Sequence, residues 1–295
     1  MKTVSLSMGT TATDFLALIK PRVTALVIAT TAAGMFLAGR PLSPSLLFWT
    51  LLGTVLLVGA ANSLNMYLER DADLLMERTK DRPLPAKRMA PPVALWFGVE
   101  LAFIAILILS VAVNPLTAFL GVVAFVSYVL FYTPLKQKTT LALLVGAVPG
   151  AMPPLMGWTA ATGSIALPGI LLFMILFLWQ IPHFLAIALF RKGEYAKAGI
   201  KVLPLEKGEL VTKHWMVRSL VALFPVPLFF IPLGLTSRLY SVTAILLNSI
   251  FFAWGCYGFR KKNNLSWARS FFLVSIIYLP VLLLVLVLTK GPLGR

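Results

Sequence analysis

The stretch 62-NSLNMYLERDADLLMERTKDRPLPAKR-88 is the densest polar segment in an otherwise apolar chain. It carries five of the ten carboxylates of the protein and six basic side chains, and the sequence on both sides is long and almost uncharged. These residues are Glu69, Asp71, Asp73, Glu77 and Asp81, with Arg70, Arg78, Lys80, Arg82, Lys87 and Arg88. Such a mixture between two membrane-length segments has no packing role, so we interpret the stretch as a functional site.

The spacing of Asn65, Glu69 and Asp73 predicts the chemistry of this site. Residues four apart in an α-helix lie on one face, about 6 Å apart along the axis. Three oxygen-bearing side chains in one row suit Mg²⁺, which completes its shell with water and substrate phosphates. The nearby Arg and Lys side chains would bind those phosphates. The alternative is a helix end whose charges are solvated and paired with one another.

The composition indicates an all-α, polytopic membrane protein. The chain has 295 residues, of which 59% are hydrophobic and 12% are charged, with a mean hydropathy of +0.90. A soluble domain has roughly 25% charged residues. The net charge of +16 would suggest nucleic acid for a soluble protein, but here it lies in loops and sets topology, so we expect no nucleic-acid partner. One cysteine and two histidines exclude a Cys- or His-built metal cluster.

We expect about nine transmembrane helices in one membrane-embedded domain, residues 1–295, with the lipid bilayer as its surroundings. The expected spans are 23–39, 46–66, 93–113, 115–132, 140–160, 168–190, 215–234, 239–259 and 269–289. This count puts 22 of the 26 Lys and Arg residues on one side, which the positive-inside rule makes cytoplasmic. The N-terminus is then expected inside, the C-terminus outside and the polar stretch at the cytoplasmic face.

Proline and glycine interrupt the span that contains VGAVPGAMPPLMGW (145–158). Kinks of this kind widen a bundle and leave room for a central cavity. The alternative is ordinary, because Gly and Pro are also frequent in membrane helices without such a role.

A second group of candidate residues lies within or just after the fourth and sixth expected spans. Gln180 and His183 lie at i and i+3 within an apolar run, and polar residues at membrane depth usually face the bundle interior or a cavity. His183 could contact a metal or a substrate, or bond to a neighbouring helix. Glu194 and Tyr195 follow near the interface, where Glu194 could complete a second acidic site. Tyr132 and Lys136 could bind a phosphate, or could be an aromatic belt residue and an anchor. Glu100 is the one carboxylate well inside an expected span, and its role is left open.

With these residues in view, the whole chain resembles the UbiA-type intramembrane prenyltransferases, and among them the protohaem IX farnesyltransferase (haem O synthase) branch. The most specific segments are NMYLERDADLLMERTKDRPLP (65–85), YTPLK (132–136) and WQIPHFLAIALF with EYAKAGIKVLP (179–204). Asn65, Glu69 and Asp73 match the first acidic motif of the superfamily. The second motif departs from the superfamily pattern, because RKGEY offers Glu194 alone.

The resemblance implies a UbiA-type helical bundle in the cell inner membrane that transfers farnesyl from farnesyl diphosphate to a vinyl group of haem B. Asn65, Glu69 and Asp73 would hold the cofactor Mg²⁺. The diphosphate would be bound by the following basic and tyrosine side chains: Arg70, Arg78, Lys80, Arg82, Tyr132 and Lys136. His183, with Gln180, is the candidate haem contact, and a haem A synthase is an implied partner.

Three other functions remain open at this point. A prenyltransferase for an aromatic or quinone precursor shares the mechanism, but is disfavoured by the MERT, RPLP and QIPHF segments and by the single Glu194. A secondary transporter predicts ionisable residues near span centres, whereas here they concentrate at one membrane face. A structural subunit of an oxidase does not explain why Asn65, Glu69 and Asp73 share one helical face.

Overall fold

The computed structural model describes residues 11–261 and 264–289, which form helices and no β-strand element. The long helices are α2 (Pro21–Leu37), α3 (Pro44–Asp73), α4 (Pro91–Ile108), α5 (Pro115–Val126), α7 (Ala142–Thr162), α8 (Leu167–Phe190), α11 (Gly208–Leu223), α12 (Arg238–Tyr257) and α13 (Asn264–Leu288). Shorter elements are α1 (Ala12–Ile19), α6 (Thr133–Leu135), α9 (Lys192–Lys197) and α10 (Leu203–Glu206), the π-helical turns η1 (Leu109–Val113) and η2 (Ser127–Tyr132), and the 3₁₀ turns η3 (Pro227–Phe230) and η4 (Gly258–Arg260).

Several long helices begin at a proline that follows an extended residue. The ring of Pro44 opens α3 and that of Pro115 opens α5, where a missing N–H costs nothing. The preceding residue then caps the first turn: Ser43 accepts a hydrogen bond from the Leu46 N–H at 3.1 Å, and Asn114 accepts one from the Thr117 N–H at 2.8 Å. These starts end the connecting loops sharply and fix where each helix enters the bundle.

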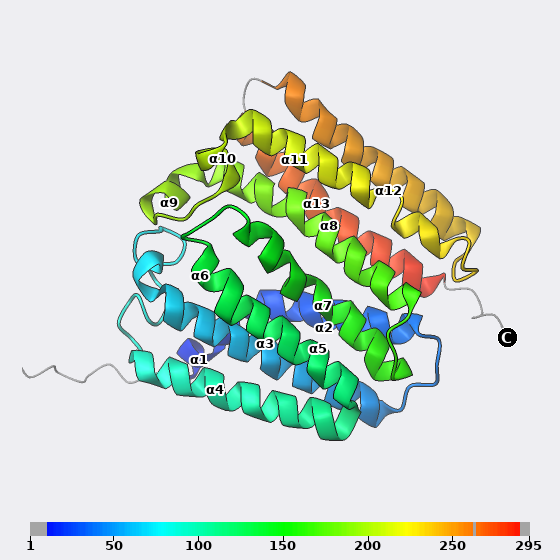
Figure 1. Cartoon of the computed structure of the whole chain (residues 1–295), viewed down its shortest axis with the longest axis horizontal. Coiled ribbons are helices and arrows are strands. Elements are labelled where there is room, and N and C mark those ends of the chain that lie inside the picture. The colour runs from blue at the N-terminus through cyan, green and yellow to red at the C-terminus, as the bar shows by residue number, and fades with distance from the viewer. Residues whose placement is uncertain (1–10, 262–263, 290–295) are drawn as a thin grey trace, which may run out of the picture.

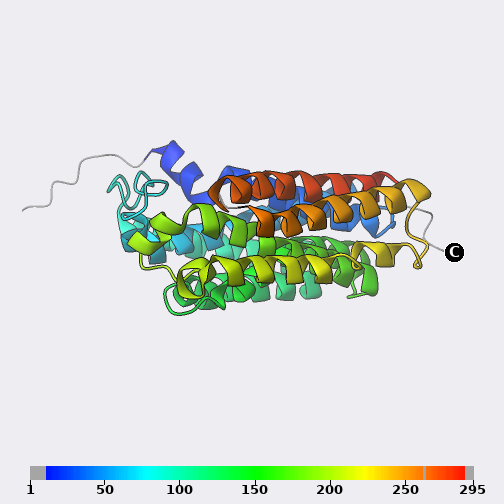
Figure 2. The same ribbon diagram turned by 90° about the horizontal axis from the view of Figure 1, so that it is seen from above.

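The long helices are arranged as a closed circuit. Helices that follow one another along the chain pack side by side from α2 to α13, and α13 returns to pack against α2. The central helix α7 packs on α2, α5 and α8 (Figure 1). The polar loop 74–90 and the segment with α9 and α10 lie at the same end of the bundle in both views (Figures 1 and 2). The two long polar segments predicted to share one side therefore do so.

Helices α2 and α7 touch backbone to backbone. A Cβ added at Gly157 would lie 1.9 Å from the carbonyl oxygen of Thr31, and one added at Gly34 would lie 2.0 Å from that of Pro154. No side chain fits at either position without moving a helix. Gly157 in the broken span and Gly34 on α2 are thus both required for the close packing of α7 on α2.

The expected all-α, polytopic architecture is confirmed, and each expected span overlaps a helix, although 215–234 is displaced toward the C-terminus relative to α11. Among the described residues, six helices are long and apolar enough to cross a membrane, or seven if α1 and α2, bent by 48°, form one span. Helices α7 and α11 are not among them. Most of α7 is buried against other helices and needs little lipophilic surface, while α11 has 16 residues and a polar first turn. The count of nine therefore stays a prediction, and the chain termini lie outside the described residues.

Candidate active site

The predicted helical row forms the last turns of α3, which runs without interruption to Asp73. Asn65 and Asp73 are buried, at 2% and 1% exposure, and Glu69 is largely covered. Each of the three side chains contacts a cation from a different segment: Lys20, Lys136 and Arg82. The row is therefore the centre of a charged cluster, rather than a solvated helix end.

Asp73 is held by the loop that follows it. Its Oδ2 lies 2.6 Å from Arg82 Nη1, and its carbonyl oxygen accepts a hydrogen bond from Thr79 Oγ1 at 2.8 Å. The other carboxylate oxygen, Oδ1, is buried and has no hydrogen-bond partner among the described residues. A buried acceptor without a donor is costly, and it is the kind of oxygen that a metal ion would use.

Glu69 pairs with Lys136 across the mouth of the bundle. Glu69 Oε1 lies 2.6 Å from Lys136 Nζ, and the side chains are 13% and 18% exposed. The ammonium also lies over the ring of Tyr132, 4.6 Å from its centroid. Burial alone would lower the pKa of Lys136, but the adjoining Tyr132 and Glu69 outweigh burial and leave that pKa raised. The Lys136 side chain is thus a fixed positive charge at this site.

Asn65 is oriented by two residues that the sequence analysis did not include in the site. Its Oδ1 accepts a hydrogen bond from Lys20 Nζ at 3.1 Å, and its Nδ2 donates one to Thr133 Oγ1 at 3.1 Å. Lys20 reaches Asn65 because it forms the bend between α1 and α2, with φ of 49°. The only sequence signal was the KPR tripeptide (20–22), in which the proline predicts a helix start.

The π-helical turn η2 connects the polar site to the bundle interior. Thr133 Oγ1 donates a hydrogen bond to the Tyr128 carbonyl at 2.9 Å, five residues back, where the wider turn leaves an acceptor. The rings of Tyr128 and Tyr132 lie 5.4 Å apart. The short segment from Tyr128 to Lys136 therefore makes three contributions. Tyr128 points into the bundle interior, the Thr133 hydroxyl bonds to Asn65, and Lys136 pairs with Glu69.

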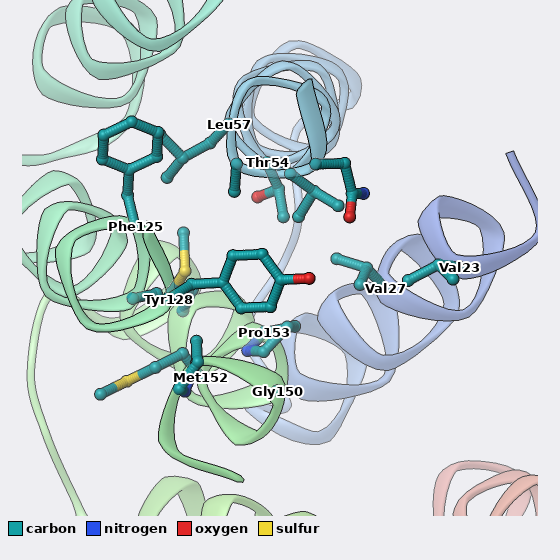
Figure 3. Close-up of a pocket in the computed structure, with 15 residues that line it drawn as sticks. Val23, Val27, Thr54, Leu57, Phe125, Tyr128, Gly150, Met152 and Pro153 are labelled. Carbon is teal, nitrogen blue, oxygen red and sulfur yellow. The ribbon is translucent and has the colours of Figure 1, made fainter. Parts of the chain in front are cut away.

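An apolar cavity lies next to this cluster. Its empty space is about 630 Å³, a figure that includes open solvent at the cavity mouth. Figure 3 shows Tyr128 projecting into it, with Val27 and Pro153 close to the ring. Its lining includes Asn62, one turn before Asn65 on α3, so the cavity and the charged row share a boundary. The remaining residues of the lining are Val23, Thr54, Leu57, Val58, Ala61, Ala124, Phe125, Pro149, Gly150, Met152 and Met156. The cavity expected beside residues 145–158 is therefore present.

Three of the expected phosphate-binding side chains lie away from the row. Arg70 turns back on its own helix, where Nη1 donates to the Tyr67 carbonyl at 2.7 Å. Lys80 is exposed and its Nζ lies 2.5 Å from Glu77 Oε2. The hydrogen bond from Lys80 lowers the pKa of Glu77. Arg78 is also exposed. Of the loop cations, Arg82 is the one that contacts the row.

The second acidic motif is not joined to the first. Glu194 Oε1 pairs with Arg191 Nη1 at 2.6 Å within the same short segment. Within residues 11–261 and 264–289, no three His, Cys, Asp or Glu side chains form a metal-binding group. The two loops do meet, because the Lys201 N–H donates to the Lys136 carbonyl at 2.9 Å. Burial raises the pKa of Tyr195, and the nearby charges of Arg78 and Lys136 act against that rise.

Gln180 and His183 lie on α8 and are not among the residues that line the cavity. Gln180 donates to the carbonyls of Leu176 and Ala147, and its Oε1 would lie 2.0 Å from a Cβ placed on the cavity residue Gly150. His183 faces α13, where its Nδ1 lies 2.7 Å from Ser275 Oγ, and its ring stacks on Trp179 at 4.7 Å. Gln180 thus supports the cavity wall, whereas His183 is outside the cavity lining.

Comparison with known protein families identifies the family of this chain. Residues 27–277 match the model of the UbiA prenyltransferase family. The chain belongs to that family. Proteins named protoheme IX farnesyltransferase from Sorangium cellulosum and Myxococcus xanthus are 52% and 49% identical to it. The first match covers 87% of this chain and 97% of the relative, and the second covers 97% of both. The resemblance stated from the sequence is confirmed.

Solved structures agree with the family assignment at the level of the fold. A digeranylgeranylglyceryl phosphate synthase superposes with a TM-score of 0.81 at 15% identity, over 94% of this chain and 97% of that one. A UbiA homologue from Archaeoglobus fulgidus, solved with GPP and Mg²⁺, gives 0.64 at 14% identity, over 92% and 99%. Such low identities show a common fold of the helical bundle and nothing finer.

Proposed function

We propose that this UbiA-family enzyme transfers the farnesyl group of farnesyl diphosphate to a vinyl group of haem B, forming haem O. One observation carries the proposal: a row of three oxygen-bearing side chains, each in contact with a cation, borders an apolar cavity. An ionic end and an apolar interior match the two halves of a prenyl diphosphate. The names of the relatives that are up to 52% identical supply the acceptor, haem B.

Asn65, Glu69 and Asp73 are the residues that would hold Mg²⁺. Their donor set is entirely oxygen, as Mg²⁺ prefers, and the unpartnered Asp73 Oδ1 gives it one free carboxylate oxygen. When bound, Mg²⁺ neutralises charge on the diphosphate leaving group and so eases departure. The use of Mg²⁺ by a relative of the same fold, solved with GPP, supports this assignment.

The chain supplies its own positive charge to the leaving group. Lys136 and Arg82 pair with the two carboxylates of the row, and Lys20 bonds to the neutral Asn65 amide. Fixed charges at the place where negative charge develops are often the largest contribution to catalysis. In this proposal the three basic side chains bind the diphosphate oxygens. The Tyr132 ring lies beneath the Lys136 ammonium and positions it. The exposed Arg78 and Lys80, with Arg70, would attract the diphosphate from solution rather than bind it in the row.

The cavity holds the isoprenoid chain and excludes water from the allylic cation. Its wall is formed by aliphatic side chains, methionines and the rings of Phe125 and Tyr128, and Asn62 is its lining residue nearest to the charged row along α3. The C–O bond to diphosphate breaks, the vinyl carbon of haem B attacks the resulting allylic cation, and water then adds to the porphyrin cation and releases a proton. Water must therefore reach the porphyrin cation but not the allylic cation.

His183 remains the candidate haem contact. Its Nδ1 is engaged with Ser275, so Nε2 is the ring nitrogen available to iron or to a propionate. The seam between α8 and α13 would then be the side from which haem approaches, with Gln180 between that seam and the cavity. A His183→Ala variant should lose a haem absorption shift that the wild type shows on titration with haem B.

The cell inner membrane, the cytoplasmic position of the site and a haem A synthase as the consumer of the product belong to the same proposal. The six or seven apolar helices support insertion in a bilayer. The gathering of both polar segments at one end of the bundle supports a site at one membrane face. A tag on the described loop 74–90 should be protected in intact cells and accessible in inverted vesicles.

The activity is tested by expressing the protein in cells that lack their own haem O synthase and extracting haem for chromatography and mass spectrometry. A haem O peak is expected, and 4-hydroxybenzoate supplied as a competing acceptor should remain unprenylated. Prenylated 4-hydroxybenzoate without haem O, from well-expressed protein, would replace haem with an aromatic acceptor. Uptake of a substrate into vesicles without any prenylated product would favour a transporter instead.

A further inference from the structure

Glu100 lies on the outer face of the bundle, although it is well inside a membrane-length helix. It is exposed on α4, nine residues after Pro91, which places it roughly 14 Å along the helix from the polar end. Its neighbours on the same face are apolar: Phe103 is 70% exposed and Leu107 is 52% exposed. Carboxylates at membrane depth usually face the bundle interior or pair with a basic group, so this position needs an explanation.

Arg218 is a charge of the opposite sign in the same situation. It is exposed on α11, ten residues after Gly208, or about 15 Å from the polar end. Val221, three residues after Arg218 on α11, is apolar and 57% exposed. In residues 11–261 and 264–289, neither Glu100 nor Arg218 is within 4 Å of an oppositely charged group.

Two tryptophans support the inference that the charges lie at matching depths. Trp96 precedes Glu100 by one turn and is 62% exposed, and Trp215 precedes Arg218 by three residues and is partly exposed. Exposed tryptophans in membrane proteins concentrate at the headgroup boundary. Both charges therefore lie about one helical turn, roughly 5 Å, on the apolar side of that boundary.

The two charged faces cannot meet within one molecule. Helix α4 runs along the lower edge of the bundle in Figure 1, whereas α11 lies near the upper edge. Helix α4 packs mainly on α3, and α11 packs on α8, α10 and α12. The outer face of α4 thus carries the negative charge of Glu100, and the outer face of α11 carries the positive charge of Arg218.

We propose that these faces associate between copies of the protein, with Glu100 of one molecule paired to Arg218 of the next. Both molecules keep the same orientation in the membrane, because the two charges lie at the same depth from the same end. The contact is heterologous, since one copy contributes α4 and the other α11, and repetition forms a ring or an open row. A second copy satisfies both charges at once, whereas an apolar partner would satisfy neither.

The test places reporter cysteines one turn beyond the charges, so that the charges themselves stay intact. In a Cys256→Ala background, one tagged copy carries Ile104→Cys, next to Glu100, and a differently tagged copy carries Val221→Cys, next to Arg218. Both copies are expressed together, and membranes are treated with a short bifunctional maleimide. We expect a cross-linked product that carries both tags, and much less product when both copies carry Ile104→Cys.

Charge variants then decide whether the pair holds the contact. Glu100→Gln on the first copy, or Arg218→Gln on the second, should weaken association about three- to twentyfold, the range for polar contacts between membrane helices. Exchanging the charges between copies, Glu100→Arg with Arg218→Glu, should restore it even if either single variant expresses poorly. Arg238→Gln removes another exposed arginine, at the start of α12, and should change nothing.

Equal cross-linking in the glutamine variants, or no recovery on charge exchange, would overturn the pairing. No product with the native charges would also overturn it, and would mean that lipid covers both faces. A strong product between two Ile104→Cys copies would instead make the contact a symmetric one through α4.

Discussion

Replacing Asp73 by asparagine removes one charge from the centre of the row, while Asp71→Asn removes the same charge two residues away. Asp73 is 1% exposed, is in contact with Arg82 and has one unpartnered oxygen. The Asp71 side chain is 85% exposed, and its nearest basic partner, Arg70, is 4.0 Å away. The two variants have the same composition and differ only in whether the lost carboxylate belongs to the site.

The expected size of each effect follows from this geometry. Removing one preorganised electrostatic contact to a developing charge typically lowers turnover about 100- to 1,000-fold, which is about 2.7–4 kcal/mol. Asp73→Asn should reach this range, because it affects metal binding and also leaves Arg82 without its partner. Asp71→Asn should stay within about twofold, since exposed ion pairs contribute about 0–1 kcal/mol.

Stability has to be separated from catalysis in this comparison. Breaking a fully buried pair costs about 3–5 kcal/mol, and the Arg82 side chain is 19% exposed, so the cost here should lie at or below the lower limit. The double variant Asp73→Asn with Arg82→Gln removes the lone cation as well. It should recover most of the lost expression but no activity.

The assay measures haem O formed in membranes from an excess of farnesyl diphosphate and haem B, normalised to folded protein by fluorescence-detected size exclusion. Binding of Mn²⁺ to the purified protein, followed by electron paramagnetic resonance, gives a second readout that does not depend on turnover. Equal rates for the Asp73→Asn and Asp71→Asn variants, with equal Mn²⁺ binding, would refute the role given to the row.

Three further substitutions test other parts of the structure. Lys136→Met should lower turnover at least 100-fold and leave Glu69 unpaired, while Lys136→Arg should keep part of the activity; equal losses would contradict a role based on charge. Gly157→Ala should prevent stable folding, because its Cβ would meet a carbonyl of α2, whereas Gly193→Ala meets nothing within 4 Å and should be neutral by melting temperature. Val27→Trp fills the cavity and should shift preference from farnesyl to geranyl diphosphate in competition assays; an unchanged preference would place the isoprenoid chain elsewhere.

Local sequence pattern predicted the parts of the site that depend on helix periodicity. Asn65, Glu69 and Asp73 share a face because four-residue spacing does so in any α-helix, and α3 continues through them. The position of the polar loops at one end followed from charge asymmetry, which the bilayer enforces along the whole chain. Both inferences need only the helix and the membrane, not the packing of one helix on another.

Contacts between distant segments were not predictable in the same way. Lys20 reaches Asn65, 45 residues later, only because the chain bends at Lys20 itself. Arg82 was one of several loop cations, and only the fold of the loop places it on Asp73. The same limit applies to Glu194, whose nearest partner proved to be Arg191, three residues before it. Several basic side chains lie close enough in sequence to pair with one carboxylate. Side-chain geometry, which sequence spacing does not give, decides which of them does.

The three ion contacts of the row imply that metal and diphosphate bind together. A divalent cation at Asn65, Glu69 and Asp73 would compete with Lys20 and Lys136 for oxygens that they contact, and would bind the free Oδ1 of Asp73 beside Arg82. All three basic groups would remain close to it. Like charges in a partly buried site repel strongly, since two unit charges 4 Å apart interact by about 4 kcal/mol at an effective dielectric constant of 20. A diphosphate removes this penalty, because its oxygens accept contacts from the basic groups as the metal binds to the row. Pairing with the chain's own cations thus keeps the carboxylates neutralised before the substrate arrives, and ties metal affinity to the presence of the group that has to leave.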